Sequence, residues 1–114
     1  MPESAVFESI AIVQTTVGTP EGARLLARLA LEHRLAACIQ AEQVTSHYRW
    51  RGALHEEAEW RLTCKTTLAV APALAALLRE RHPYALPEIV VATVQASAGY
   101  ARWVGEEVAP PPAD

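Results

Sequence analysis

SHYRWRGALHEEAEWRLTCK, residues 46–65, decides the fold of this 114-residue chain. Gly52 supplies a turn between two runs of alternating residues. On the returning run, apolar side chains such as Leu62 and Cys64 share one parity, whereas Glu59 and Lys65 share the other. Period-2 alternation on a run that follows a turn residue is typical of an antiparallel hairpin with one buried face. The sequence therefore predicts a long β-hairpin that begins near residue 37 and ends at residue 65.

The outgoing strand of this hairpin changes the face that carries its apolar side chains. Ile39 has one parity, whereas Tyr48 and Trp50 have the other. Because the side-chain period of a strand is 2, a pattern that changes face in this way requires one extra residue. We therefore predict a β-bulge around Glu42–Gln43.

Two strands and three helices flank the hairpin in the predicted order. Thr19 is the expected N-cap of the first helix, with Pro20 at its first position, and Pro83 ends the second helix because it forces His82 out of helical geometry. The predicted elements are a strand at 6–16, a helix from Pro20 to about Arg34, a helix after Thr67, a strand at 88–95 and a short helix at 97–107.

The order β-α-β-β-α-β predicts an α+β fold of the ferredoxin-like type, an antiparallel sheet with both main helices on one face and a short C-terminal helix. We expect residues 1–108 to form a single domain and residues 109–114 to form a disordered tail. The second face of the sheet has no helical cover within the chain. Val90 and Val91 are adjacent and apolar on both parities, so we expect another copy of the chain to cover this sheet.

Composition excludes several classes of protein. The net charge of −3 gives no electrostatic basis for binding nucleic acid. No apolar stretch approaches the roughly 20 residues needed to span a bilayer, and residues 1–10 carry acidic side chains instead of the basic segment of a secretory signal. We expect a cytoplasmic protein without nucleic-acid or membrane partners, in which Cys38 and Cys64 are reduced, small buried residues.

Along almost its whole length the chain resembles the CutA family, the divalent-cation tolerance proteins. The resemblance rests on motifs in a fixed order: Leu35-Ala36-Ala37-Cys38, then Ser46, Tyr48, Trp50 and Gly52, then Glu59 and Lys65-Thr66, then His82-Pro83-Tyr84 with Pro87-Glu88-Ile89, and finally Tyr100 and Trp103. Each motif is weak alone, but the whole set in this spacing is highly specific. The resemblance implies a ferredoxin-like subunit, a homotrimer shaped like the PII signalling trimers, and a role in tolerance to copper and other divalent cations.

The segment HPYALPEI, residues 82–89, carries the first candidate site. His82 and Glu88 offer an imidazole and a carboxylate, which are ligands suited to copper(II), zinc or nickel. Two groups do not make a tight site, and Glu59 or Glu57 is the best-placed third ligand. The alternative is structural: His82 caps helix carbonyls while Glu88 accepts hydrogen bonds at the start of a strand.

The second candidate site is a cleft between subunits, lined by Tyr48, Trp50, Lys65 and Tyr84. There Lys65 could hold a small anionic ligand, as in a PII-like sensor. The alternative is that Lys65 forms an ordinary surface ion pair with Glu57 or Glu59. No glycine-rich phosphate loop supports an anion site.

No nucleophile with a basic partner forms a recognisable catalytic motif, and Asp114 is the only aspartate. We therefore expect that the protein is not an enzyme and that it needs no obligatory cofactor. The function predicted from the sequence is divalent-cation tolerance with weak binding of copper or another divalent cation. The alternative is a trimeric sensor of a small anion.

Overall fold

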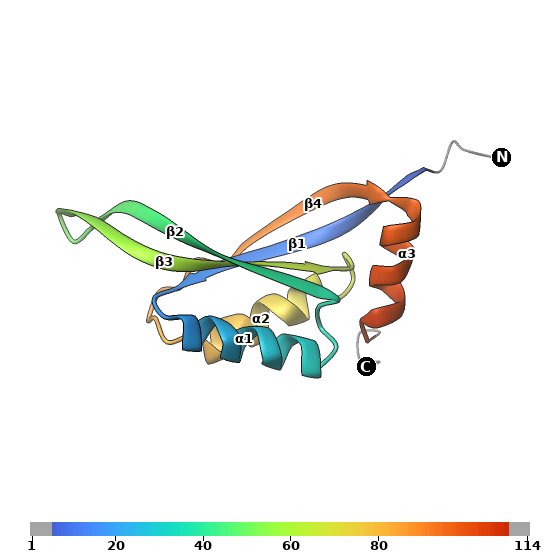
Figure 1. Ribbon diagram of the computed structural model, residues 1–114, viewed down its shortest axis with the longest axis horizontal. Coiled ribbons are helices and arrows are strands. Elements are labelled where there is room, and N and C mark those ends of the chain that lie inside the picture. Colours follow the sequence, from blue (N-terminus) through green and yellow to red (C-terminus); the bar gives the residue numbers. More distant parts are fainter. Residues whose placement is uncertain (1–5, 110–114) are drawn as a thin grey trace.

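A computed structural model of the chain describes residues 6–109, and its elements follow the predicted order (Figure 1). They are β1 (Phe7–Val17), α1 (Pro20–Glu32), β2 (Cys38–Trp50), β3 (Ala53–Thr66), α2 (Ala71–Arg81), β4 (Val90–Ser97) and α3 (Ala98–Glu107). The four strands form one antiparallel sheet in the order β2-β3-β1-β4. The predicted α+β ferredoxin-like fold with a short C-terminal helix is thus confirmed, and the trimer stays a prediction.

The first helix begins where its capping residues predict. The Gly22 N–H donates to Oγ1 of Thr19 at 3.0 Å, which satisfies one of the free amides of the first turn. Pro20 occupies the first turn, where its missing N–H costs nothing. The helix ends at Glu32, and Arg34 then adopts a positive φ of 56°, which turns the chain back toward the sheet.

The core lies between α1, α2 and one face of the sheet. Figure 1 shows both helices under the same face of the sheet. The fully buried side chains that join these layers include Val13 and Val17 of β1, Leu62 and Cys64 of β3, Leu26 of α1, and Leu74 and Leu78 of α2. Burial of these side chains is the main favourable contribution to folding.

The hairpin pairs without interruption from Cys38↔Lys65 to Trp50↔Ala53, so the predicted bulge at Glu42–Gln43 is wrong. A two-residue turn closes the hairpin, with Arg51 and Gly52 at φ values of 50° and 80°. The prediction failed because it assumed that one face stays buried along the whole strand. The distal half of the hairpin projects past the helices (Figure 1), and Leu54 there is 76% exposed.

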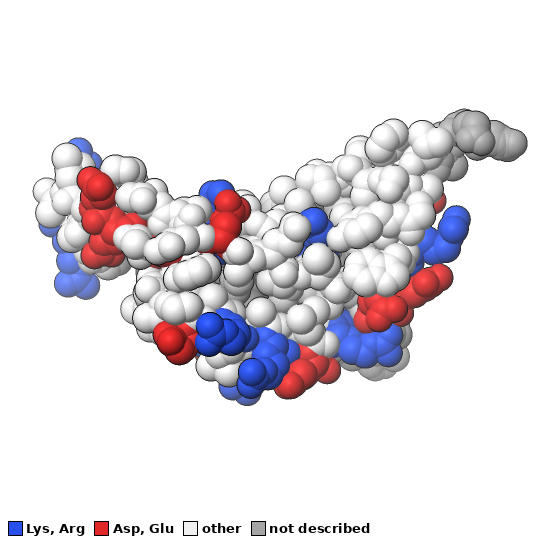
Figure 2. Space-filling model, in the orientation of Figure 1, with Lys and Arg blue, Asp and Glu red and all other residues white. Residues whose placement is uncertain are grey.

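The face opposite α1 and α2 was expected to have no helical cover, but α3 covers it at one end, where Tyr100 lies beside Lys65 of β3; the rest of this face is open. Val104 of α3 is fully buried, and the adjoining Ala109 donates its N–H to the Arg34 carbonyl at 2.7 Å. Ala109, the first residue of the predicted tail, is therefore anchored, and residues 110–114 lie outside the described residues. Val90 and Val91 of β4 are each about half exposed. Figure 2 shows few charged side chains over β1 and β4 compared with the helices and the hairpin tip.

The two cysteines point to opposite faces of the sheet. Cys38 pairs with Lys65, whereas the neighbouring pair contains Ile39 and Cys64. Cys64 is fully buried, and burial raises the pKa of its thiol to about 12, which keeps it protonated. Cys38 is only partly buried, so the expectation of a buried residue is met by Cys64 alone. Because the side chains lie on opposite faces, they cannot form a disulfide across the hairpin.

No helix within residues 6–109 is both long and apolar enough to cross a membrane.

Adjacent leucines of α1 offer a matched test of the core. Leu26 is 2% exposed, whereas Leu25 is 51% exposed. Leu26→Ala should lower the free energy of unfolding by about 2–5 kcal/mol because it leaves a cavity against the sheet. Leu25→Ala should change it by less than about 0.5 kcal/mol. Guanidinium unfolding of the two variants checks this, and equal losses would mean that the described face of α1 is incorrect.

Candidate functional site

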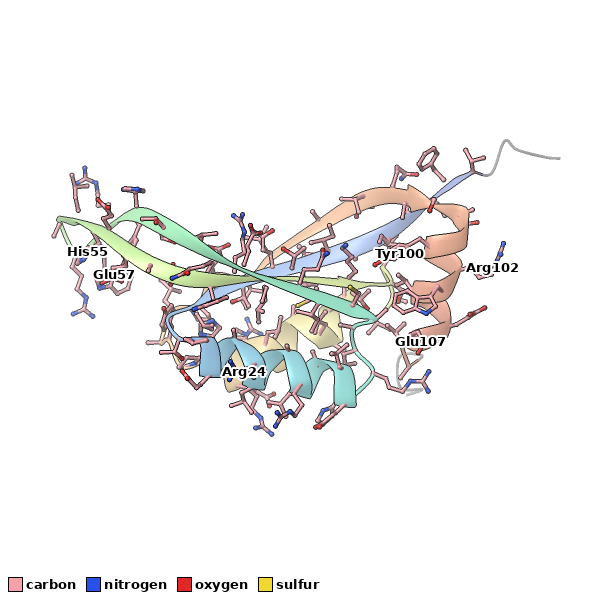
Figure 3. All side chains as sticks on the ribbon, in the orientation of Figure 1. Arg24, His55, Glu57, Tyr100, Arg102 and Glu107 are labelled. Atoms are coloured by element: carbon pink, nitrogen blue, oxygen red, sulfur yellow. The ribbon has the colours of Figure 1, made fainter. Side chains whose placement is uncertain are left out.

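A groove of about 740 Å³ lies between the distal hairpin and the loop that joins α2 to β4. Three aromatic residues, Tyr48, Trp50 and Tyr84, line it. Three carboxylates, from Glu57, Glu59 and Glu88, and the imidazole of His47 also line it, and among residues 6–109 no lysine or arginine does. Figure 3 shows His55 and Glu57 on the distal part of the hairpin. The groove therefore combines apolar ring surface with negative charge.

Two of the groove carboxylates, those of Glu57 and Glu59, each accept a hydrogen bond from a tyrosine hydroxyl. Tyr48 Oη donates to Glu57 Oε1 at 2.6 Å, and Tyr84 Oη donates to Glu59 Oε2 at 2.8 Å. The hydrogen bond to Glu57 raises the pKa of Tyr48, and burial together with the Glu59 contact raises the pKa of Tyr84 well above its usual value. Both phenols therefore remain protonated donors at neutral pH and fix the carboxylates in place.

Glu59 is the most constrained of the acidic groups. It is 8% exposed although it lies on the sheet face opposite α1 and α2. Within residues 6–109 the ion pairs join His47 to Glu56 and Arg61 to Glu42, and neither includes Glu59. A carboxylate removed from water without a counter-ion is costly. This site is therefore complementary to a cation.

His82 fixes the loop to the end of β1. Its Nε2 lies 2.9 Å from the Thr16 carbonyl oxygen and 3.0 Å from Thr15 Oγ1. Its Nδ1 lies 3.1 Å from the Tyr84 amide nitrogen. Because a backbone N–H can only donate, Nδ1 is the acceptor and the proton of the neutral ring is on Nε2. Both nitrogens are engaged, so His82 offers no free lone pair to a metal in this conformation.

The local backbone explains why His82 reaches β1. The last helical residue is Arg81, and His82, which directly precedes Pro83, is extended, with φ −71° and ψ 139°. The ring then points to β1 and does not cap the carbonyls of α2, which was the structural alternative. Gly18 leaves room for the Tyr84 hydroxyl, because a Cβ at position 18 would lie 3.1 Å from Tyr84 Oη.

The structure brings together most, but not all, of the side chains predicted to form a site. Tyr48, Trp50, Tyr84, Glu59 and Glu88 line the groove. His82 lies behind the loop, against β1. Among residues 6–109 no three His, Cys, Asp or Glu side chains are close enough to hold a metal ion together. The predicted set of His82, Glu88 and Glu59 is therefore not assembled as a three-ligand metal site within one chain.

Lys65 lies apart from the other predicted cleft residues within the chain. Its Nζ donates to Gln40 Oε1 at 2.9 Å and stands 5.7 Å from the centroid of the Tyr100 ring. Figure 3 shows Tyr100 on the side of α3 that faces the sheet. Neither an ion pair with Glu57 nor one with Glu59 forms. The roles of Thr16 and Gly18 could not be predicted from the sequence, because they depend on a loop that lies more than 60 residues away.

Protonation of His82 should weaken the fold. Burial is the main cause that lowers its pKa below the usual 6.5, against smaller opposing effects of the Thr16 carbonyl and Glu59. The unfolded chain therefore takes up this proton at a higher pH than the folded chain does. The stabilisation is complete above about pH 6.5 and is lost as the pH falls below it.

We therefore expect His82→Gln to reduce the loss of stability between pH 7.5 and pH 5.5, measured by guanidinium unfolding at both pH values. The control is His47→Gln, which removes a histidine side chain that is 69% exposed. An unaltered pH dependence in His82→Gln would contradict the assigned role of the ring.

Comparison with known proteins identifies relatives of this chain. Residues 11–107 match the family described as CutA1 divalent ion tolerance protein. The divalent-cation tolerance protein CutA of Thermus thermophilus is 38% identical over 97 residues, which are 83% of this chain and 94% of that protein. Protein CutA of Mus musculus is 35% identical over 98 residues, and the match spans 84% of this chain but only 55% of the mouse protein.

The fold agrees with these relatives. The structure of CutA from Synechococcus elongatus superposes with a TM-score of 0.85 at 36% identity, covering 92% of this chain and 97% of that chain. The family match covers nearly all of the described residues and includes both the hairpin and the loop that form the groove. This chain belongs to the CutA1 family of divalent ion tolerance proteins.

Proposed function

We propose that this protein acts in tolerance to divalent cations by holding such ions weakly in the groove, without catalysing a reaction. The observation that carries the proposal is Glu59, a buried carboxylate that has no ion-pair partner within residues 6–109. Glu57 and Glu88 add negative charge to the same groove. Membership of a family whose relatives are named for divalent-cation tolerance gives independent support.

The chemistry of the groove suits a weakly held divalent ion. Glu57 and Glu59 each use one carboxylate oxygen to accept a phenol hydrogen bond, which leaves the other oxygen for a ligand. Carboxylate oxygen favours Mg²⁺, Ca²⁺ and Mn²⁺, and copper(II) binds more tightly than most divalent ions at sites of this kind. Because residues 6–109 of one chain offer no three-residue set, water or a second subunit must complete the coordination. His82 acts in this proposal by positioning Tyr84.

The anion alternative has less support. An anion in the groove would face Glu57, Glu59 and Glu88 without a lysine or arginine in the lining. Lys65, the cation that the alternative requires, contacts Gln40 and Tyr100 instead. We therefore favour a cation as the occupant.

The proposed assembly is a homotrimer in which copies of the chain cover the open parts of the sheet. Val90 and Val91 are half exposed, and apolar strand surface of this kind is typical of a face that packs against another subunit. The projecting hairpin adds Trp50, 43% exposed, and Leu54, 76% exposed. Aromatic and aliphatic side chains of this kind anchor subunit contacts.

Manganese(II) tests the proposed function because it prefers carboxylate oxygen to the imidazole nitrogen of the hairpin histidines. We expect weak binding, in the millimolar to sub-millimolar range, with Glu59→Gln losing at least about fivefold in affinity, which is about 1 kcal/mol. Glu107→Gln on α3 is the control. The free ion is measured by electron paramagnetic resonance. An absence of binding at millimolar ion, or equal affinity in Glu59→Gln, would refute the proposal.

The trimer has its own test in sedimentation at micromolar concentration. We expect a species of about three times the 12.4 kDa chain mass. Val90→Asp should shift the population toward smaller species because it places a charge in an apolar contact. Leu25→Asp, on the outward side of α1, should not. A wild-type monomer at this concentration would exclude the assembly.

A further inference from the structure

The hydroxyls of Tyr48 and Tyr84 hold two of the carboxylates, but the ring faces of the groove have no role as ligands to a metal ion. Tyr48, Trp50 and Tyr84 are 38%, 43% and 38% exposed and all three line the groove beside Glu59. We propose that the groove binds a small organic ammonium ion, with its methylated nitrogen against these rings and its charge facing Glu59. This inference concerns the same groove as the proposed function but does not require metal binding, because the rings contribute nothing to a hydrated metal.

Ring surface and buried negative charge together define the class of ligand. The face of an aromatic ring attracts a cation, most strongly for tryptophan, and the effect increases when the cation is stripped of water. Glu59, more than nine-tenths buried and without an ion-pair partner within residues 6–109, supplies a charge for such a ligand. Removing water from a quaternary ammonium ion costs less free energy than removing it from a small metal ion. Such an ion can therefore contact both the ring faces and the Glu59 carboxylate.

The rings are held in place before any ligand arrives. Tyr48 stacks on His55, with ring centroids 5.1 Å apart and planes 12° apart. Tyr84 lies against the His82 ring at 4.9 Å. The phenols of both tyrosines are also fixed by their hydrogen bonds to Glu57 and Glu59. Preorganised rings lose little conformational freedom on binding, which favours affinity.

Trp50 already attracts a cation within the chain. The guanidinium carbon of Arg51 lies 5.5 Å from the centroid of its ring. Arg51 covers one side of the indole and does not line the groove. A ligand therefore either binds the side of the Trp50 ring that lines the groove or displaces the exposed Arg51 side chain.

Other ligand classes fit the groove less well. An anion meets three carboxylates, and a neutral apolar molecule leaves Glu59 without a counter-ion. The volume of about 740 Å³ is larger than a simple ammonium ion and lies in the range of small-molecule sites. The ammonium group is therefore one end of a somewhat larger molecule, and choline is a suitable minimal probe.

The test compares choline with 3,3-dimethylbutan-1-ol, which has the same shape but carbon in place of the charged nitrogen. Binding is followed by chemical-shift titration of the tryptophan indole N–H signals. We expect choline to bind wild type at least about fivefold more tightly than the neutral alcohol. Equal affinity for the two probes, or no shift at tens of millimolar choline, would overturn the inference.

Two matched pairs of variants locate the binding. Trp50→Leu should weaken choline binding at least about threefold, and Trp103→Leu, which changes a tryptophan of α3 with 40% exposure, should not. Glu59→Gln should lower choline affinity to that of the neutral alcohol, whereas Glu107→Gln should not. If Trp50→Leu and Trp103→Leu bind choline equally, the groove is not the site. If Trp50→Leu does not fold, the comparison of the two probes on wild type still decides.

The ammonium inference and the metal proposal can fail separately. Manganese(II) and choline are therefore titrated separately against the wild-type protein. Choline binding without manganese(II) binding would refute the proposed function alone. Manganese(II) binding with no preference for choline over the neutral alcohol would refute the ammonium inference alone.

Discussion

The hydrogen bonds of the His82 ring fix the geometry on which the groove depends. Nε2 holds the end of β1 through the Thr16 carbonyl, and Nδ1 orients the amide of Tyr84. Tyr84 then reaches Glu59, and its hydroxyl occupies the space left free by Gly18. A single imidazole thereby links the end of α2, the first strand and the hairpin. This explains why a histidine followed by a proline begins the loop between α2 and β4.

The fold could be predicted from the sequence because its signals are local. Each signal acts over a few residues: the alternation on β3, the capping of α1 by Thr19 and Pro20, and the end of α2 before Pro83. The structure places these elements where the signals predict. The bulge at Glu42–Gln43 was wrong for a related reason. Parity indicates a buried face only where something covers the strand, and the distal hairpin extends beyond the helices.

The site could be predicted only in part because its contacts join distant segments. The sequence indicated a candidate site at residues 82–89, and five of the seven candidate side chains line one groove. It could not show that His82 Nε2 is engaged by β1, since its partners there are 66 and 67 residues away. Lys65 has the same parity as Glu59 on β3 but lies six residues further along the strand, beside α3.

The shape of the chain connects the groove with assembly. The principal extents are 55 × 31 × 23 Å and the radius of gyration is 15.5 Å, against about 13 Å for a compact domain of this length. The excess comes from the projecting hairpin, and a two-stranded ribbon without a core is marginally stable in water.

Within the chain, the contact between Tyr84 and Glu59 supports this ribbon at its base, where Glu59 is buried. Beyond that point Leu54 remains exposed, and its burial would require another copy of the chain. The side chains that would bind a ligand therefore stand on the segment that most needs a neighbouring subunit. A ligand in the groove and a subunit beside the hairpin would then stabilise the same conformation, so each should favour the other.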